Sequence, residues 1–162
     1  MADTNKVKFG LSHVYYALLT YGANDAITFG NPVAIKGGVN LTLSAEGDMS
    51  PFYADNMVYY MASMNAGYSG DLEVARIPDS FKTDVLNYVT DSAGALVETT
   101  NAEYKPFALL FQIEGDKNAR RHVLYNCMAN RPQLTAGTTT ASKEPQTETI
   151  PLTCSSIPNT AL

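Results

Sequence analysis

The chain has 162 residues, enough for one domain with a substantial hydrophobic core. Hydrophobic residues make up 45% of it and charged residues 17%, and ten tyrosines with no tryptophan favour strands. The net charge of −5 repels phosphate, which disfavours a protein that grips nucleic acid. Residues 1–8 lack a signal peptide's apolar run, and no later stretch has the ~20 apolar residues of a membrane span. We therefore expect folding in the cytoplasm and no membrane partner.

Short strands are predicted throughout the first part of the chain. Three segments rich in β-branched and aromatic residues are bounded by glycine or turn signals: 7–9, 13–19 and 33–35. Val39, Leu41 and Leu43 then alternate with polar residues, the period-two pattern of a strand with one buried face. This alternation is the clearest strand signal in the sequence.

Residues 45–56 are predicted to form a long contact loop. The segment contains Gly, Pro and three acidic residues, but it also carries aromatic side chains. Loops of about a dozen residues are usually either disordered or functional, and disordered segments rarely keep aromatic residues. We therefore expect a partner surface here, whose members are Asp48, Phe52, Tyr53, Asp55 and Asn56.

The remaining segments predict further strands and one helix. A helix-start signal at Pro78 is followed by Phe81, Val85 and Val89 on one helical face, which predicts a helix reaching about Val89. The other predicted elements are strands over 57–63 and 71–77 joined by a turn over 64–70, a minor hairpin within 93–102, a long hairpin with strands 107–113 and 121–129, a flexible Thr-rich segment 133–144, and a last strand over about 147–155.

These elements predict a mainly β fold. Many short strands with one helix favour an antiparallel β-sandwich or partial barrel with the helix on its flank. We expect residues 1–155 to form a single domain and 156–162 to form a C-terminal tail.

Constellations for catalysis or for binding a metal or cofactor are not expected. His13 and His122 lack metal-ligand spacing, and Cys127 and Cys154 lack a CxxC motif, so the cysteines are interpreted as buried reduced thiols. Loop acids such as Glu114 are interpreted as solvated turn residues. These patterns disfavour an enzyme.

Arg120 and Arg121 form the densest basic spot in the sequence. Two arginines do not make a nucleic-acid patch, and salt bridges to an acidic loop of a neighbouring subunit are favoured over phosphate contacts. Asp48 and Asp55 are the candidate charge partners.

Several longer stretches resemble the major tail protein family of long-tailed, non-contractile phages that infect Gram-positive bacteria. They are KFGLSHVYY (8–16), NPVAIKGGVNLTLSAEGD (31–48), FYADN (52–56), GYSGDLEVARIPDSFKTDVL (67–86), KPFALLFQIEGD (105–116), RRHVLYNCMANRP (120–132) and EPQTETIPLT (144–153). Together they cover most of the chain and are far more specific than a short motif.

The resemblance implies a virion protein that builds the tail tube. It implies hexameric rings whose inner strands join into one barrel, stacked rings, and a lumen that DNA passes with only non-specific contact. It also implies a tape measure protein, a tail terminator and distal tail or baseplate proteins as partners. Some relatives append an immunoglobulin-like module, which we do not expect in a chain that ends at Leu162.

Three other functions remain open from sequence. A carbohydrate-binding decoration or receptor-binding β-sandwich would present a tyrosine platform such as Tyr15, Tyr59, Tyr60 and Tyr68, although the lack of tryptophan weakens it. A small hydrolase is disfavoured by the missing constellations. A bacterial injection-system tube would share the ring architecture but not the resembling stretches.

Overall fold

A computed structural model of the protein describes residues 7–23 and 26–157, which form twelve strands and one helix. The elements in chain order are β1 (Leu11–Tyr21), β2 (Ile27–Phe29), β3 (Val33–Ala34), β4 (Gly38–Glu46), β5 (Met49–Ala54), β6 (Met57–Ser63), β7 (Gly67–Val74), α1 (Asp79–Asp84), β8 (Val89–Thr90), β9 (Leu96–Val97), β10 (Phe107–Ile113), β11 (Arg121–Ala129) and β12 (Glu148–Cys154). Within the described residues, no helix is long and apolar enough to cross a membrane.

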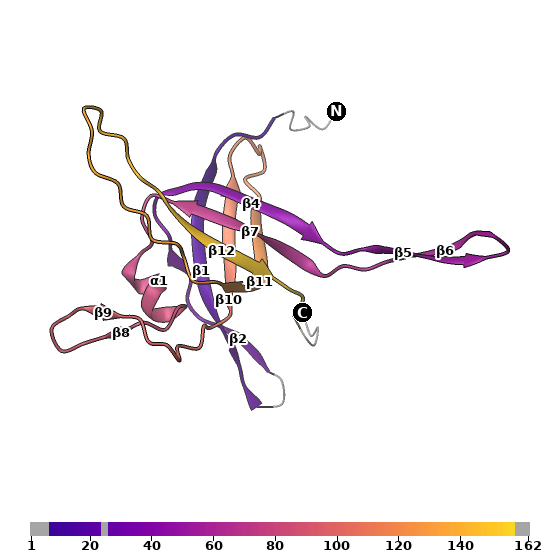
Figure 1. The fold of residues 1–162 in the computed structure, drawn as a ribbon, viewed down its shortest axis with the longest axis horizontal. Helices are drawn as coiled ribbons and strands as arrows, with labels where there is room; N and C mark the ends of the chain where they lie inside the picture. Colours follow the sequence, from indigo (N-terminus) through magenta and orange to yellow (C-terminus); the bar gives the residue numbers. More distant parts are fainter. Residues whose placement is uncertain (1–6, 24–25, 158–162) are drawn as a thin grey trace.

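The main sheet has eight strands, and every pairing in it is antiparallel. Its order is β2-β1-β10-β11-β12-β7-β4, with β3 paired to β1 as a branch. The junction between β11 and β12 is short, because only three residues of each strand pair there. We therefore distinguish a first half-sheet (β1, β2, β3, β10 and β11) from a second half-sheet (β4, β7 and β12), whose strands cross those of the first in Figure 1.

The two half-sheets bury one hydrophobic core between them. The side chains of Tyr16, Phe81 and Phe107 form its aromatic centre, with edge-to-face ring centroids 5.2 Å and 5.5 Å apart. Gly38, at the start of β4, lies against Val14 of β1, so the second half-sheet reaches over the first. This curled antiparallel sheet with one short helix confirms the mainly β prediction.

Most predicted strands are confirmed. The alternating residues 39–44 lie in β4, and residues 57–63 form β6 with the predicted bounds. The long hairpin also has its predicted bounds, as β10 and β11. These segments combine β-branched or aromatic residues with clear polar turns.

Two predictions in the first half of the chain are wrong, and a third is confirmed only in part. Residues 7–9 are not a strand, although the Phe9 N–H donates to the Glu114 carbonyl at 2.8 Å. Residues 64–70 are not a turn joining paired strands, because β6 pairs with β5 whereas β7 pairs with β4 and β12. Residues 71–74 of the strand predicted over 71–77 lie in β7, which begins earlier, at Gly67, and ends at Val74. The glycines that favoured a turn lie inside this ladder instead.

The prediction that residues 45–56 form a loop is also wrong. Residues 45 and 46 end β4, residues 49–54 form β5, and Asp55-Asn56 is the turn that leads to β6. The acidic and proline residues suggested irregular structure, but pairing with β6 imposes an extended conformation on them. That these residues contact a partner stays a prediction.

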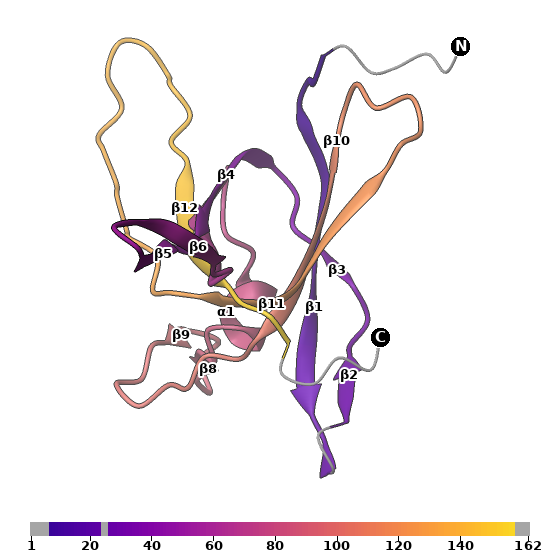
Figure 2. The same cartoon turned by 90° about the vertical axis from the view of Figure 1, so that its right-hand side faces the viewer.

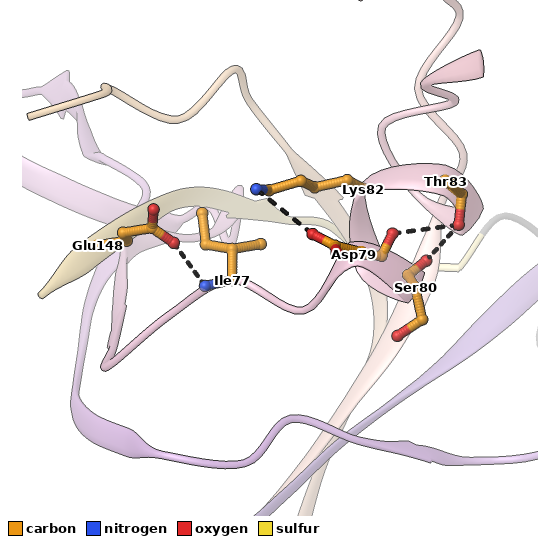
Figure 3. A network of polar contacts seen from close by, with 6 residues as sticks. All are labelled: Ile77, Asp79, Ser80, Lys82, Thr83 and Glu148. Atoms are coloured by element: carbon orange, nitrogen blue, oxygen red, sulfur yellow. Dashed lines mark hydrogen bonds and ion pairs between the residues drawn. The ribbon is translucent and has the colours of Figure 1, made fainter. Parts of the chain in front are cut away.

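The helix begins where predicted but ends earlier than Val89. The Thr83 hydroxyl donates to the backbone carbonyls of Asp79 and Ser80, and the Glu148 carboxylate of β12 accepts the Ile77 N–H at 2.5 Å (Figure 3). After α1, Asn87 adopts a left-handed φ of 55°, a conformation that ends helices and that Asn tolerates. Val89 then enters β8.

The predictions for the remaining segments are confirmed in part. A minor hairpin exists, but it is formed by β8 and β9 and so begins before residue 93. Residues 133–144 are exposed and belong to no helix or strand, and whether they are flexible stays a prediction. Of the predicted C-terminal tail, only residues 156 and 157 lie within the described part, and residues 158–162 lie outside it.

Tyr16 should make the stability of the fold sensitive to alkaline pH. Burial raises the pKa of Tyr16 to about 12, and its hydroxyl donates to Asp84 Oδ2 at 2.8 Å. Because the folded pKa exceeds the unfolded value of about 10, this stabilisation is complete below pH ~10 and is lost as pH rises toward 12. Tyr16→Phe should cost about 1 kcal/mol at neutral pH and weaken the alkaline decline.

Urea unfolding at neutral and alkaline pH measures both effects. Tyr21→Phe is the matched control, because Tyr21 is 47% exposed and ends the same strand. Equal pH dependence in Tyr16→Phe and the unsubstituted protein would contradict the assignment.

Candidate functional site

A two-stranded arm, formed by β5 and β6, extends the β4–β7 pair away from the core. The ladder continues across the joint, where the Ala66 N–H donates to the Glu46 carbonyl at 2.8 Å and the Met64 N–H donates to the Asp48 carbonyl at 3.2 Å. Gly47 has a φ of 146°, and a Cβ there would lie 2.0 Å from the Met64 carbonyl oxygen. Figure 1 shows the arm projecting to one side, and in Figure 2 it lies clear of the first half-sheet.

The tip of the arm is a two-residue hairpin turn. Ala54 pairs with Met57, and the residues between them, Asp55 and Asn56, have φ values of 51° and 59°. Positive φ at both central residues defines a type I′ turn, whose twist matches that of paired strands. Two of the five predicted contact residues thus shape the arm itself.

The arm exposes large apolar side chains on both of its faces. Phe52 pairs with Tyr60 on one face, and Pro51 pairs with Met61 on the other. Phe52 is 61% exposed and Tyr53 is 65% exposed, and every residue of β6 is exposed. An isolated two-stranded ribbon is at best marginally stable in water, and monomers rarely expose contiguous apolar patches of this kind. The arm therefore has the character of an interface.

The two candidate arginines lie on another part of the molecule. Arg120 ends the β10–β11 connection, where its Nε lies 3.8 Å from Asp116 Oδ2, and Arg121 begins β11. Arg121 also lines a surface cavity together with His13 and Tyr15. The fold does not bring these arginines to the arm of the same chain, so their pairing with Asp48 or Asp55 would require a second subunit.

The outward face of the second half-sheet is polar and acidic. Its cross-strand rows are Asn40–Glu73–Thr149, Thr42–Asp71–Pro151 and Ser44–Ser69–Thr153. None of the three strands contains Lys, Arg or His, whereas β4 and β7 contribute Glu46, Asp71 and Glu73. The Glu73 carboxylate accepts the Thr147 hydroxyl at 2.5 Å, and Glu46 accepts the Ser69 hydroxyl. Sequence reasoning missed this face, because it joins segments far apart in the chain.

β4 is an edge strand of the second half-sheet. Among the described strands it pairs only with β7, so one side of its backbone ladder is open. It has nine residues and no Pro or Lys, the residues that commonly protect edges from pairing. Such an edge can accept another chain's strand.

The residues considered for chemistry do not converge. The His122 ring stacks on Phe111 with centroids 5.2 Å apart, whereas Cys127 lies beside Cys154. The described residues include no group of three His, Cys, Asp or Glu side chains that could hold a metal ion. The tyrosines considered for a carbohydrate platform lie on three different elements. Tyr59 and Tyr60 are in the arm, Tyr68 is in β7, and Tyr15 is in β1.

Comparison with known proteins identifies the family of this β-rich fold. Residues 2–150 match the sequence model of the phage tail tube proteins. The match spans most of the chain, so the protein belongs to the phage tail tube protein family. No curated protein and no solved structure matches it significantly.

Family membership defines what the protein does. It is a structural, non-enzymatic component of the virion tail, and it self-assembles into the tail tube. The predicted role as a structural protein of the tail tube and the predicted lack of enzymatic activity are confirmed by this membership. Among the described residues, the arm, the open edge and the acidic face are candidate surfaces for this assembly.

Asn56, at the tip of the arm, should tolerate only residues that adopt a left-handed backbone conformation easily. Asn56→Gly should preserve the arm, because glycine adopts left-handed φ freely. Asn56→Val should destabilise the turn by about 1–2 kcal/mol, the cost of that conformation for an ordinary L-residue. Cross-strand NOEs between residues 54 and 57 in the isolated subunit report the turn. Ser50→Val, in strand β5 of the same arm, should leave these NOEs intact, and equal losses in both valine variants would contradict the turn assignment.

Proposed function

We propose that the chain assembles into hexameric rings that stack to form the tail tube, the conduit through which DNA is ejected into the host. The observation that carries this proposal is the arm, which places apolar side chains on two faces where its own chain cannot cover them. A polymer of identical subunits supplies a covering surface at every position along its length. The resemblance to tail proteins supports six subunits per ring.

Contacts within a ring would use the open edge of β4. Its unpaired N–H and C=O groups would pair with a strand of the neighbouring subunit, so that inner sheets join into one barrel. Closure around a ring leaves no free edge. This explains why a long edge strand without protective Lys or Pro is tolerated.

Contacts between rings would use the arm. Phe52 and Tyr53 would be its buried anchors, with Asn56 in the turn at its tip. Asp48 and Asp55 would pair with Arg120 or Arg121 of a subunit in the next ring, which would fix the orientation of stacking. Stacking of this kind is heterologous, since different surfaces meet, and translation along an axis never closes. An open tube results.

Six equivalent arms per ring make the stack strong. Once one arm has docked, the others bind at high effective concentration, so individually modest contacts combine into a tight junction. Because nothing in such a polymer limits its growth, another protein must set its length. We propose a tape measure protein for this role, with a tail terminator at one end and distal tail or baseplate proteins at the other.

The acidic face of the second half-sheet would line the lumen. Asp71 and Glu73 would repel passing phosphates, and the surrounding hydroxyl and amide side chains carry no positive charge to retain them. Screening limits these fields to ~8 Å at physiological salt, so only lumenal residues matter to the DNA. Contact with DNA would remain non-specific.

Removal of the two arm anchors should block stacking. The double variant Phe52→Ala, Tyr53→Ala should fold normally but should raise the protein concentration at which tubes form roughly tenfold or more, since buried aromatic anchors dominate interface energies. Negative-stain microscopy and sedimentation measure this. Leu134→Ala is the control, because it removes an apolar side chain that is 85% exposed outside the arm. Unchanged tube assembly in the double variant would exclude the arm from stacking.

Reversal of the lumenal charge should slow genome ejection. Asp71→Lys should permit tube assembly, because Asp71 is exposed, but should slow DNA release severalfold as phosphates bind the new cations. Glu144→Lys makes the same charge change in the exposed 133–144 segment and should have no effect. Ejection kinetics of particles carrying each variant test the proposal, and equal rates would show that Asp71 does not face the DNA.

A further inference from the structure

The cysteines of β11 and β12 lie directly opposite one another at the junction of the two half-sheets. Cys127 pairs with Cys154, and only two further residue pairs join these strands. The Ser155 N–H donates to the Asn126 carbonyl, and the Asn130 N–H donates to the Pro151 carbonyl, so the hydrogen-bonded positions flank the cysteines. Cys127 and Cys154 therefore form a non-hydrogen-bonded pair, the kind in which opposing Cα atoms and side chains approach most closely.

Both thiols are reduced and enclosed by the core. Cys127 is completely buried, Cys154 is 4% exposed, and their Sγ atoms lie 2.6 Å apart. Opposed residues at a non-hydrogen-bonded position have the Cα separation that a disulfide requires. The spacing of 27 residues gave no sign of this contact, and neither assembly nor the lumen uses it.

We propose that Cys127 and Cys154 are a latent disulfide site, which hydrogen peroxide or a related small peroxide oxidises to join the two half-sheets covalently. A virion component functions outside the cell, where no thiol-reducing system maintains its cysteines. A small oxidant suits this site because the thiols are buried. The inference depends on the strand register and not on the proposed ring architecture.

Cys154 is the first cysteine to react. It is the last residue of β12, so fraying of the strand end exposes it before Cys127. The hydrogen bond from Cys127 lowers the pKa of Cys154, whereas the same hydrogen bond and burial raise the pKa of Cys127. The position of Cys154 at the end of its strand and its lowered pKa both favour Cys154 as the first nucleophile, and Cys127 reacts in the second step.

The reaction balances with one peroxide per cysteine pair. The Cys154 thiolate attacks a peroxide oxygen, the O–O bond breaks, and a sulfenic acid and hydroxide form. The Cys127 sulfur then attacks the Cys154 sulfur, and the S–O bond breaks with release of a second hydroxide. The two thiol protons convert both hydroxides to water. Each sulfur loses one electron, and the peroxide gains two.

The bond would reinforce the narrowest junction of the fold. It would close a loop that contains the exposed segment 133–144, and so would restrict the unfolded chain as well as tie β11 to β12. A subunit stapled in this way should resist unfolding more strongly than the reduced subunit.

Peroxide treatment of the full chain, as subunits and as assembled tubes, tests the site. After treatment, thiols titrated in denaturant should fall from two per chain to none, and the intact mass should fall by two hydrogens. A tryptic digest without reductant should link peptides 122–143 and 144–162. The midpoint of thermal unfolding should rise by roughly 5 °C or more, and dithiothreitol should reverse the rise.

Cys154→Ala is the control, because its single thiol cannot form the internal bond and its unfolding temperature should not rise. If this variant fails to fold, the treated protein with and without dithiothreitol still decides the question. Persistence of both thiols, conversion to sulfinic acid alone, or links only between subunits on a non-reducing gel would each overturn the proposal.

Discussion

The structure depends on one long antiparallel ladder that runs past the edge of the hydrophobic core. Within the core, β4 and β7 bury side chains such as Leu72 against the first half-sheet. Beyond Gly47 the same ladder continues as β5 and β6, where no other described element covers it. The two strands hydrogen-bond to each other along its length, but apolar side chains at its far end stay in water. We propose that another subunit of the tube covers these side chains.

The short junction between β11 and β12 has equally broad consequences. Three residue pairs hold the two half-sheets, which lets the sheet curl and enclose the Tyr16, Phe81 and Phe107 rings. The same curl turns the acidic rows of the second half-sheet outward. One face of that half-sheet is therefore committed to the core, and the other is free to face a lumen. Core formation and the proposed conduit are two results of one topology.

Sequence patterns predicted the strands whose side chains pack into the core. They did not predict strands that form only because their backbone pairs with another strand. The alternation in β4 and the apolar runs in β10 and β11 were recognisable because the core selects their side chains. In β5 both faces are exposed, so no hydrophobic period reveals the strand, and Pro51 within it and the aspartates on either side are typical of a loop. Likewise, the helix ends at Asp84, and the left-handed backbone at Asn87 prevents it from resuming, although the apolar period continues to Val89.

The sequence by itself determined the mainly β class, the long hairpin and, through the resembling stretches, membership of the tail tube proteins. The exposure of Phe52 and Tyr53 was also predictable, since aromatic side chains amid acidic and turn residues have no reason to be buried locally, and their contact with a partner stays a prediction. Only the tertiary structure decided that these residues form an arm, that acidic residues of distant strands share a face, and that Cys127 meets Cys154. These are matters of strand order and register, which long-range pairing sets and local residue patterns do not encode.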